Sequence, residues 1–315
     1  MKITVLDAAT LGNDVTFEKW DALGELEVYK TSPANEVVNR LKSSDVAILN
    51  KVKITKEILF ALPKLKLICV AATGYDNIDL DACRERGVAL CNVKGYSTHS
   101  VAQVTLSLVL ALMTHIPEYS EAVKSGEYTK SGIQNKLTPV FHELYGKTFG
   151  VVGLGNIGKQ VARVAEAFGC RVLCFKRTPD PEYNCTDLET LLKESDVVTL
   201  HLPLNDQTKN IIDKNALSLM KKSAILINAA RGAVTDEVAV ADAIKNGIIG
   251  GFATDVYSVE PMEESNPLQQ IKDFPNVILT PHMAWGAYES RLRCIDEIAQ
   301  NITAFSKGEK RNRII

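Results

Sequence analysis

The sequence has no excess of charge of either sign. Its 36 Lys and Arg residues are matched by 38 Asp and Glu residues, which leaves a formal net charge of −2 at pH 7. A chain so balanced has no bulk electrostatic attraction for nucleic acid or for an anionic membrane surface. We therefore expect its partners to be small molecules or further copies of the same chain.

The sequence also lacks a long apolar run. The longest, VAQVTLSLVLALM at 101–113, is too short and too interrupted to span a bilayer. The amino terminus turns acidic at Asp7 before any apolar stretch reaches the length of a signal peptide. Both observations predict a cytoplasmic protein.

Paired cysteines are absent as well. The seven cysteines are scattered along the chain, with no CxxC pair and no Cys/His cluster. An odd and scattered set indicates neither a disulfide framework nor a zinc site, so we expect no bound metal. We interpret these cysteines as small apolar residues of the core.

Apolar residues, in contrast, are plentiful enough for more than one core. The 315 residues are 46% hydrophobic, and the chain is longer than a single core usually supports. Short runs rich in β-branched residues alternate with helical patterns in two series. The first series is KITVLD (2–7), DVAILN (45–50), LKLICVAA (65–72) and VALCN (88–92), and the second is FGVVGLG, CRVLCF, DVVTLHL, SAILINAA, GGFATDV and NVILTP. This alternation predicts an α/β protein with two doubly wound parallel-sheet domains.

Two segments have more than one interpretation. A polar, turn-rich segment at 117–146 follows the long apolar helix predicted at about 99–116. It is either an ordinary surface loop or an arm that packs against a second subunit. The last helical stretch, at 289–310, could cross back to either of the two α/β units.

A glycine-rich turn opens the second series. The segment KTFGVVGLGNIGKQVA at 147–162 reads as a strand, a turn and the start of a helix. In such a turn one of Gly153, Gly155 and Gly158 permits the tight bend, one lets backbone N–H groups approach a phosphate, and one lets the helix pack on the strand. The sequence therefore predicts a dinucleotide site here.

The acid that usually accompanies this turn is missing. Dinucleotide-binding units commonly hold a ribose diol with an Asp or Glu about 20 residues after the glycines. Here RVLCFKRT at 171–178 places Lys176, Arg177 and Thr178 at the end of the second strand. These residues offer hydrogen-bond donors and positive charge to a 2′-phosphate, so we predict that NADPH is preferred over NADH. In the alternative, both cations point into solvent and either cofactor is used.

Polar residues follow several strands in the carboxy-terminal third. INAARGAVTD places Arg231 after a strand, ATDVYSVEP places Asp255 and Glu260, and LTPHMAWG places His282 and Trp285. Ligands of open α/β sheets bind outside the carboxyl ends of the strands, so these side chains are expected to converge beside a nicotinamide. Taken singly, each has an ordinary structural explanation. A cation, an acid and a histidine together after a cofactor motif indicate a catalytic site.

The order of these motifs resembles that of the D-2-hydroxyacid dehydrogenases over nearly the whole chain. The matching motifs are ATGYDNID (72–79), GLGNIG, HLPL, NAARG, DVYSVEP and TPHMAW. Within that family, NVKGYSTHSVAQ at 92–103 and Trp285 look most like the glycerate dehydrogenases, also called hydroxypyruvate reductases.

The resemblance implies a role for each matching residue. Arg231 would bind the substrate carboxylate, His282 would act as acid and base, and Glu260 would be its partner. The backbone at Thr73, Gly74 and Tyr75 would help Arg231 to bind the substrate. Lys51 and Trp285 are also expected to bind the substrate, because they would meet across the cleft and shape the pocket. The resemblance also implies that the cofactor is bordered by Asn156, Ile157, His201, Pro203, Ala229 and Asp255. The motifs themselves add further expected cofactor-binding residues, which are Gly153, Gly155, Gly158, Lys176, Arg177 and Thr178.

The resemblance also implies an architecture. Residues 98–286 would form a Rossmann cofactor domain, and residues 1–97 and 287–315 would form a flavodoxin-like substrate domain. Residues 117–146 would serve a homodimer.

The function expected from these features is reversible NAD(P)H-dependent reduction of a small 2-keto acid, hydroxypyruvate or glyoxylate, to the D-2-hydroxy acid. Two alternatives remain open. One is a nicotinamide-sensing binding protein of the corepressor type, and the other is a D-lactate-type dehydrogenase with a different keto acid. Retention of Arg231, Glu260 and His282 favours an enzyme, because a sensor does not need a proton donor.

Overall fold

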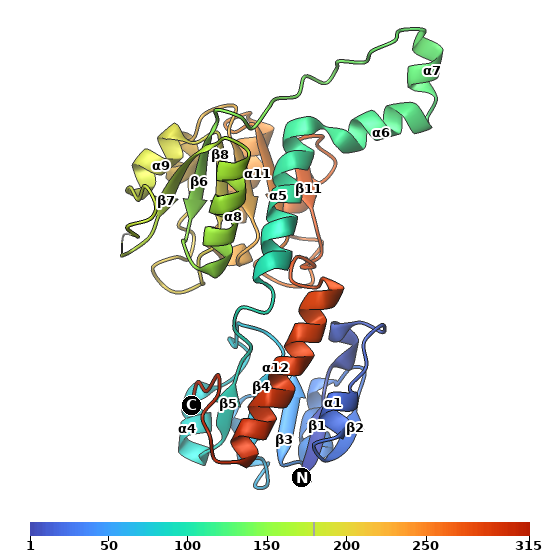
Figure 1. The fold of residues 1–315 in the computed structure, drawn as a ribbon, viewed down its shortest axis with the longest axis vertical. Coiled ribbons are helices and arrows are strands. Elements are labelled where there is room, and N and C mark those ends of the chain that lie inside the picture. Colours follow the sequence, from blue (N-terminus) through green and yellow to red (C-terminus); the bar gives the residue numbers. More distant parts are fainter. Residues whose placement is uncertain (179) are drawn as a thin grey trace. The chain divides into compact units, whose positions relative to one another are not determined.

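The computed structural model (Figure 1) describes residues 1–178 and 180–315. The chain forms two compact units: unit 1 comprises Met1–Ser97 and Gly286–Ile315, and unit 2 comprises Thr98–Trp285. Each unit contains one parallel sheet with its own helices. The prediction of two parallel-sheet α/β domains is confirmed.

The sheet of unit 1 has the strand order β2-β1-β3-β4-β5, which is the flavodoxin-like order. Its strands are β1 (Lys2–Val5), β2 (Glu25–Val28), β3 (Val46–Leu49), β4 (Leu67–Val70) and β5 (Ala89–Cys91). The helices of this unit are η1 (Ala8–Leu11), α1 (Glu18–Asp21), η2 (Ala34–Glu36), α2 (Val37–Leu41), α3 (Lys56–Phe60), α4 (Leu80–Arg86) and α12 (Tyr288–Ser306). Strands β3, β4 and β5 are buried along their whole length, as their apolar sequences predict.

Strand β2 is missing from the sequence-based prediction. It pairs in parallel with β1 at the edge of the sheet, with Lys2 opposite Glu25 and Val5 opposite Val28. Its sequence, ELEV, alternates glutamates with apolar residues, and no residue of the strand is fully buried. Such a short, charged edge strand carries little of the apolar signal from which buried strands are recognised.

The last long helix, α12, belongs to unit 1, which settles the question of where it crosses. It packs against β4 and α1. Its residues Cys294, Ile295 and Ile298 are buried, and the indole N–H of Trp20 donates to the Ile295 carbonyl over 3.0 Å. Trp20 itself is fully buried, so this helix completes the core of the amino-terminal sheet.

The sheet of unit 2 has the order β11-β10-β9-β8-β6-β7, and every pairing is parallel. The strands are β6 (Thr148–Val152), β7 (Arg171–Phe175), β8 (Val197–Leu200), β9 (Ile225–Asn228), β10 (Gly251–Thr254) and β11 (Val277–Leu279). From β6 the chain goes to β7 on one side and then to β8 on the other. The topological switch point, where open α/β sheets bind ligands, is therefore at the carboxyl end of β6.

Helices cover both faces of this sheet (Figure 1), as a doubly wound fold requires. Residues of α5 and α8 pack on one face, and residues of α9, α10 and α11 pack on the other. The bounds are α5 (Thr98–Thr114), α8 (Asn156–Ala167), α9 (Leu188–Glu194), α10 (Lys214–Leu219), η3 (Gly232–Val234), α11 (Glu237–Lys245) and η4 (Pro267–Gln270).

Residues 116–143, which we call the arm, are partly helical. The arm contains α6 (Ile116–Lys124) and α7 (Glu127–Ser131), followed by an extended segment, and it reaches away from the sheet of unit 2 (Figure 1). The prediction of a turn-rich segment is wrong for its first half, because Tyr119 and Ala122 line one face at helical spacing. Among residues 1–178 and 180–315, no single helix is long and apolar enough to cross a membrane; α5 and α6 reach that length only as a pair bent by 62°.

Candidate active site

The glycine turn between β6 and α8 has the geometry of a phosphate cradle. Gly153 has φ +99°, and a Cβ there would lie 2.8 Å from the His201 carbonyl carbon. A Cβ on Gly158 would lie 2.1 Å from the Gly153 carbonyl oxygen, so the helix packs directly on the turn. Gly155 is different, since a Cβ there would meet no protein atom within 4 Å. That open space, in front of the amino end of α8, fits a dinucleotide pyrophosphate.

His201 lies beside this turn, at the end of β8. Burial lowers the pKa of its imidazole to about 3, so the ring is neutral at physiological pH. Its Nε2 lies 3.1 Å from the Thr199 hydroxyl. Its Nδ1 is buried and has no hydrogen-bond partner among the residues that the structure describes. A polar ligand in the cradle would satisfy this nitrogen, which is a second feature that fits a cofactor.

Arg231 follows β9 on a turn fixed by Asn228. The Asn228 amide donates to the Arg231 carbonyl over 3.0 Å and accepts from the Ala230 N–H over 3.1 Å. The Arg231 guanidinium donates through Nη1 to the Ala230 carbonyl over 2.8 Å. The next residue must be glycine, because a Cβ on Gly232 would lie 1.9 Å from the Tyr257 backbone. The cation is thus held at the carboxyl end of β9, with its side chain partly exposed.

Glu260 and His282 form an acid and histidine pair. The Glu260 Oε2 lies 2.6 Å from the His282 Nδ1, and the two side chains are 30% and 25% exposed. The other carboxylate oxygen accepts from the Tyr257 N–H over 3.2 Å. Because Nδ1 faces the Glu260 carboxylate, Nε2 on the opposite side of the ring points away from it. His282 also has φ +53°, a left-handed backbone conformation that is strained for a histidine and is common at functional sites.

A buried carboxylate, Asp255, holds the loop that carries His282. Asp255 is 1% exposed. Its Oδ1 accepts from the Thr280 hydroxyl over 2.7 Å and from the Met283 N–H over 2.9 Å, and its Oδ2 accepts from the Ala284 N–H over 2.8 Å. The sequence predicts that Asp255 borders the cofactor. In the structure its contacts are to the 280–284 loop, which carries His282.

A second buried carboxylate, Glu237, holds the segment that carries Glu260. This residue opens α11, and it accepts from the Ser258 N–H over 2.8 Å and from the Asn266 side chain over 2.9 Å. Sequence reasoning missed it, because an acid in the first turn of a helix usually faces solvent. Tyr257 joins the two loops, since its hydroxyl donates to the Thr280 carbonyl over 3.0 Å. Burial raises the pKa of Tyr257 to about 12, so it remains a donor.

The segment after β7 contains an acid, Asp180, that belongs to none of the sequence motifs. The carboxylate of Asp180 lies 2.8 Å from the Lys159 Nζ and 3.2 Å from the Lys176 Nζ. The hydrogen bond from Lys159 is the main cause that lowers the pKa of Asp180 to about 2. Arg177 and Thr178 are exposed. Lys176 is therefore engaged in an ion pair, whereas Arg177 faces solvent.

The predicted residues of unit 1 follow β3 and β4, which are neighbours in its sheet. Burial raises the pKa of Asp7, whose carboxylate accepts from the Asn50, Lys51 and Val52 N–H groups, the shortest bond being 2.6 Å from Lys51. The Asn77 amide donates to the Val52 carbonyl over 2.7 Å and so ties the two loops together. The Thr73 hydroxyl donates to the Val93 carbonyl over 2.8 Å. Lys51 and residues 73–75 therefore lie on one ordered edge of unit 1.

The remaining predicted residues all belong to unit 2. Asn156 and Ile157 form the first turn of α8, Pro203 follows β8, and Ala229 follows β9. Trp285 follows Ala284 at the end of the loop that carries His282, and the Ala284 carbonyl accepts from the Ser100 hydroxyl over 2.5 Å. Unit 2 thus places the residues predicted for catalysis and for cofactor binding along the carboxyl edge of its sheet.

The comparison with protein families agrees with this arrangement. The family model described as D-isomer specific 2-hydroxyacid dehydrogenase, NAD binding domain, matches residues 106–284, which contain the glycine turn, Arg231, Glu260 and His282. The chain belongs to the D-isomer specific 2-hydroxyacid dehydrogenases. The resemblance predicted from the motifs is confirmed, and the fold and the cradle described above are those of a dehydrogenase of this family.

Relatives of this dehydrogenase cover its whole length. It is 38% identical over 312 residues to the glycerate dehydrogenase of Methylorubrum extorquens, with 99% of this chain and 98% of the relative covered. It is 34% identical over 321 residues to the hydroxypyruvate reductase of Blautia hydrogenotrophica, with 99% of each covered. Among solved structures it is similar to an acyclic imino acid reductase in complex with NADPH and D-Arg, with a TM-score of 0.88, 31% identity and all of both chains covered.

Proposed function

We propose that this dehydrogenase reduces a small 2-keto acid, hydroxypyruvate or glyoxylate, reversibly to the D-2-hydroxy acid. The observation that carries the proposal is the 2.6 Å contact between Glu260 and His282, on the same sheet edge as Arg231 and the glycine turn. The glycerate dehydrogenase and hydroxypyruvate reductase relatives support the choice of substrate.

Cofactor binding is assigned to unit 2. The open space at Gly155 and the amino end of α8 would receive the pyrophosphate, and the buried Nδ1 of His201 would receive a polar group of the cofactor. When bound, the reduced nicotinamide supplies the hydride that reduces the keto carbon. The other cofactor contacts are assigned to Asn156, Ile157, Pro203, Ala229 and Asp255.

The protein's own residues supply the proton and the orientation. His282 donates a proton from Nε2 to the forming alkoxide, while Glu260 fixes Nδ1 as the other N–H of the ring. Arg231 grips the substrate carboxylate with two parallel hydrogen bonds, which a lysine could not make. Further substrate contacts are assigned to Trp285, to Lys51 and to the backbone of Thr73, Gly74 and Tyr75.

A substrate panel tests the proposal against its alternatives. Purified protein is assayed with hydroxypyruvate, glyoxylate and pyruvate, and binding of the cofactor is titrated in parallel. Hydroxypyruvate or glyoxylate should give the highest kcat/KM. A clear preference for pyruvate would favour a D-lactate-type enzyme, and cofactor binding without turnover of any keto acid would favour the nicotinamide sensor.

For the cofactor we propose a preference for NADPH over NADH. Arg177 and Thr178 are exposed at the end of β7, and Lys176 adds a cation whose charge Asp180 partly offsets. A hydrogen bond to a charged group contributes about 1.5–3 kcal/mol, and screening in an open site reduces it, so the expected preference is about tenfold. Values of kcat/KM for both cofactors are measured at one ionic strength, in the wild type and in Arg177→Ala. Equal or NADH-favouring values in the wild type would contradict this preference.

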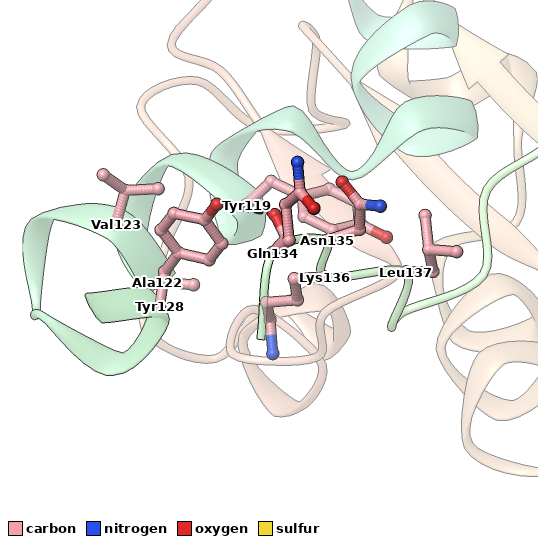
Figure 2. A pocket seen from close by; sticks show the side chains of 8 residues that line it. All are labelled: Tyr119, Ala122, Val123, Tyr128, Gln134, Asn135, Lys136 and Leu137. Carbon is pink, nitrogen blue, oxygen red and sulfur yellow. Dashed lines mark hydrogen bonds between the residues drawn. The ribbon is translucent and has the colours of Figure 1, made fainter. Parts of the chain in front are cut away.

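We also propose that the arm holds two copies together in a homodimer. Ile133, Leu137 and Val140 are 66–70% exposed, and exposed apolar patches of this kind mark interfaces. Figure 2 shows side chains of α6, α7 and the extended segment lining a groove of about 280 Å³. Leu137→Asp should dissociate the dimer in sedimentation experiments. The control is Val238→Asp, an exposed valine on α11, which should leave the dimer intact.

A further inference from the structure

Three charged groups meet where the adenosine ribose of a dinucleotide is expected, at the end of the second strand of the cofactor unit. Lys176 is the first residue after β7, and Lys159 lies in the first turn of α8. The Oδ2 atom of Asp180 is 3.2 Å from the Lys176 Nζ and 2.8 Å from the Lys159 Nζ. One carboxylate oxygen is therefore shared by two ammonium groups.

Both oxygens of the Asp180 carboxylate already accept from protein groups. Its side chain is 8% exposed, and its second oxygen accepts from the Glu182 N–H over 3.3 Å. The Asp180 backbone N–H donates to the Cys185 Sγ over 3.2 Å, which fixes the residue in place. A ribose diol would therefore have to compete with these groups for the Asp180 oxygens. NAD-binding proteins of this fold commonly use an acid at this strand end to bind the ribose hydroxyls. Here the nearby acid, Asp180, binds two lysines instead.

The charge of Asp180 acts instead on the two lysines. A 2′-phosphate that contacts Lys176 would approach an ammonium group whose charge is already shared with a carboxylate, and the two anions would repel each other. NADH carries no 2′-phosphate and meets no such repulsion. We propose that Asp180 determines how strongly this enzyme selects NADPH, by competing with the 2′-phosphate for Lys176 and Lys159, an effect that rests on the NADPH binding proposed above.

A binding experiment separates this role from catalysis. The ligands are 2′,5′-ADP and 5′-AMP, which differ only in the 2′-phosphate, and their dissociation constants are measured by calorimetry on the full-length protein at one ionic strength. In Asp180→Asn the affinity for 2′,5′-ADP should rise on the order of fivefold, the size expected for one partly exposed charge contact, while the affinity for 5′-AMP stays the same. Asp180→Ser keeps a short acceptor for the Glu182 N–H and is the second variant if the amide does not fold.

The matched control is Glu182→Gln. Glu182 is 71% exposed and lies 3.8 Å from the Lys159 Nζ, so this change removes the same charge from the same segment and leaves the ion pair of Asp180 with Lys176 in place. It should change the affinity for 2′,5′-ADP by less than about twofold. An equal gain in Glu182→Gln and Asp180→Asn would show a general charge effect and overturn the proposal. An unchanged or lower affinity in Asp180→Asn would overturn it as well.

The experiment distinguishes a failure of the Asp180 proposal from a failure of the proposed cofactor preference. If the wild type binds 2′,5′-ADP no better than 5′-AMP but Asp180→Asn gains affinity for 2′,5′-ADP alone, the wild-type preference is wrong and the role of Asp180 stands. If the wild type prefers 2′,5′-ADP and Asp180→Asn changes nothing, the preference stands and the role of Asp180 is wrong.

Discussion

In both units, buried carboxylates bind backbone N–H groups of the loops that follow the strands, but these loops carry different functional groups in the two units. In unit 1 the buried carboxylate of Asp7 binds three backbone N–H groups, and the loop it orders carries a lysine and peptide groups. In unit 2 the buried carboxylates of Asp255 and Glu237 hold two loops that carry the His282 and Glu260 side chains. Buried acids thus order the loops of both units, and the titratable pair proposed for proton transfer lies in unit 2.

The largest effect on activity is expected when the proton donor of unit 2, His282, is replaced. His282→Asn should lower kcat about 10²–10⁴-fold, the usual contribution of general acid catalysis, because asparagine cannot donate a proton. Asparagine tolerates the left-handed backbone, so the loop should keep its shape. Steady-state kinetics are compared with a cofactor titration, in which the dissociation constant should change little. Turnover within a few-fold of the wild type would disprove the acid assignment.

A smaller loss of activity is expected when Arg231, the cation on the same sheet edge, is replaced. Arg231→Lys should raise KM for the keto acid and lower kcat, with kcat/KM reduced about 10–100-fold, since an ammonium keeps the attraction and loses the two-pronged geometry. Arg171→Lys is the control, because Arg171 lies at the amino end of β7 and pairs with Glu194 over 2.6 Å. Kinetics of Arg231→Lys that match this control would move the carboxylate site elsewhere.

Replacing Asp255 should lower both stability and activity, because this buried acid holds the loop that carries His282. In Asp255→Asn one acceptor oxygen becomes an N–H₂ group, which leaves a backbone donor of the 280–284 loop without its bond. An unsatisfied buried donor costs about 1–3 kcal/mol, so urea denaturation should show a loss of this size in the free energy of unfolding. kcat should fall with it, by about tenfold if the loop moves away from Glu260. An Asp255→Asn variant with full stability would mean that Asp255 does not hold the loop.

The smallest effect concerns the acid of unit 1. Burial raises the pKa of Asp7 in the folded state above its ordinary value of 3.8, so the folded protein binds a proton more readily than the unfolded chain. Stability contributed by this group is present below pH 3.8 and is lost as pH rises through the higher, folded pKa. Relative to Asp7→Asn, the wild type should therefore become more stable as pH is lowered through that window. Parallel urea titrations at several pH values measure the difference, and curves that run parallel with pH would contradict it.

Most of the architecture could be predicted because buried parallel strands are continuous apolar runs. Strand β2 could not, since two of its four residues are glutamates and it is recognised only by its pairing with β1. The catalytic candidates were found because each follows a strand at a sheet edge. The contacts of Asp180 and Glu237 could not be predicted. Each depends on which distant lysine or backbone group the folded chain brings within about 3 Å, and the neighbouring residues in the sequence do not determine this.

The crossing of α12 has a consequence for synthesis on the ribosome. Unit 2 is inserted between the β5 strand and α12 of unit 1, so 188 residues, from Thr98 to Trp285, must be made before α12 can reach its place. At about 5–20 residues per second, this takes on the order of 10–40 s. During that interval the nascent amino-terminal sheet exposes the apolar surface that Ile295 and Ile298 later cover, beside Trp20. Unit 2 can close its own core as soon as Trp285 has emerged, so the unit that is made later is the first that can be completed.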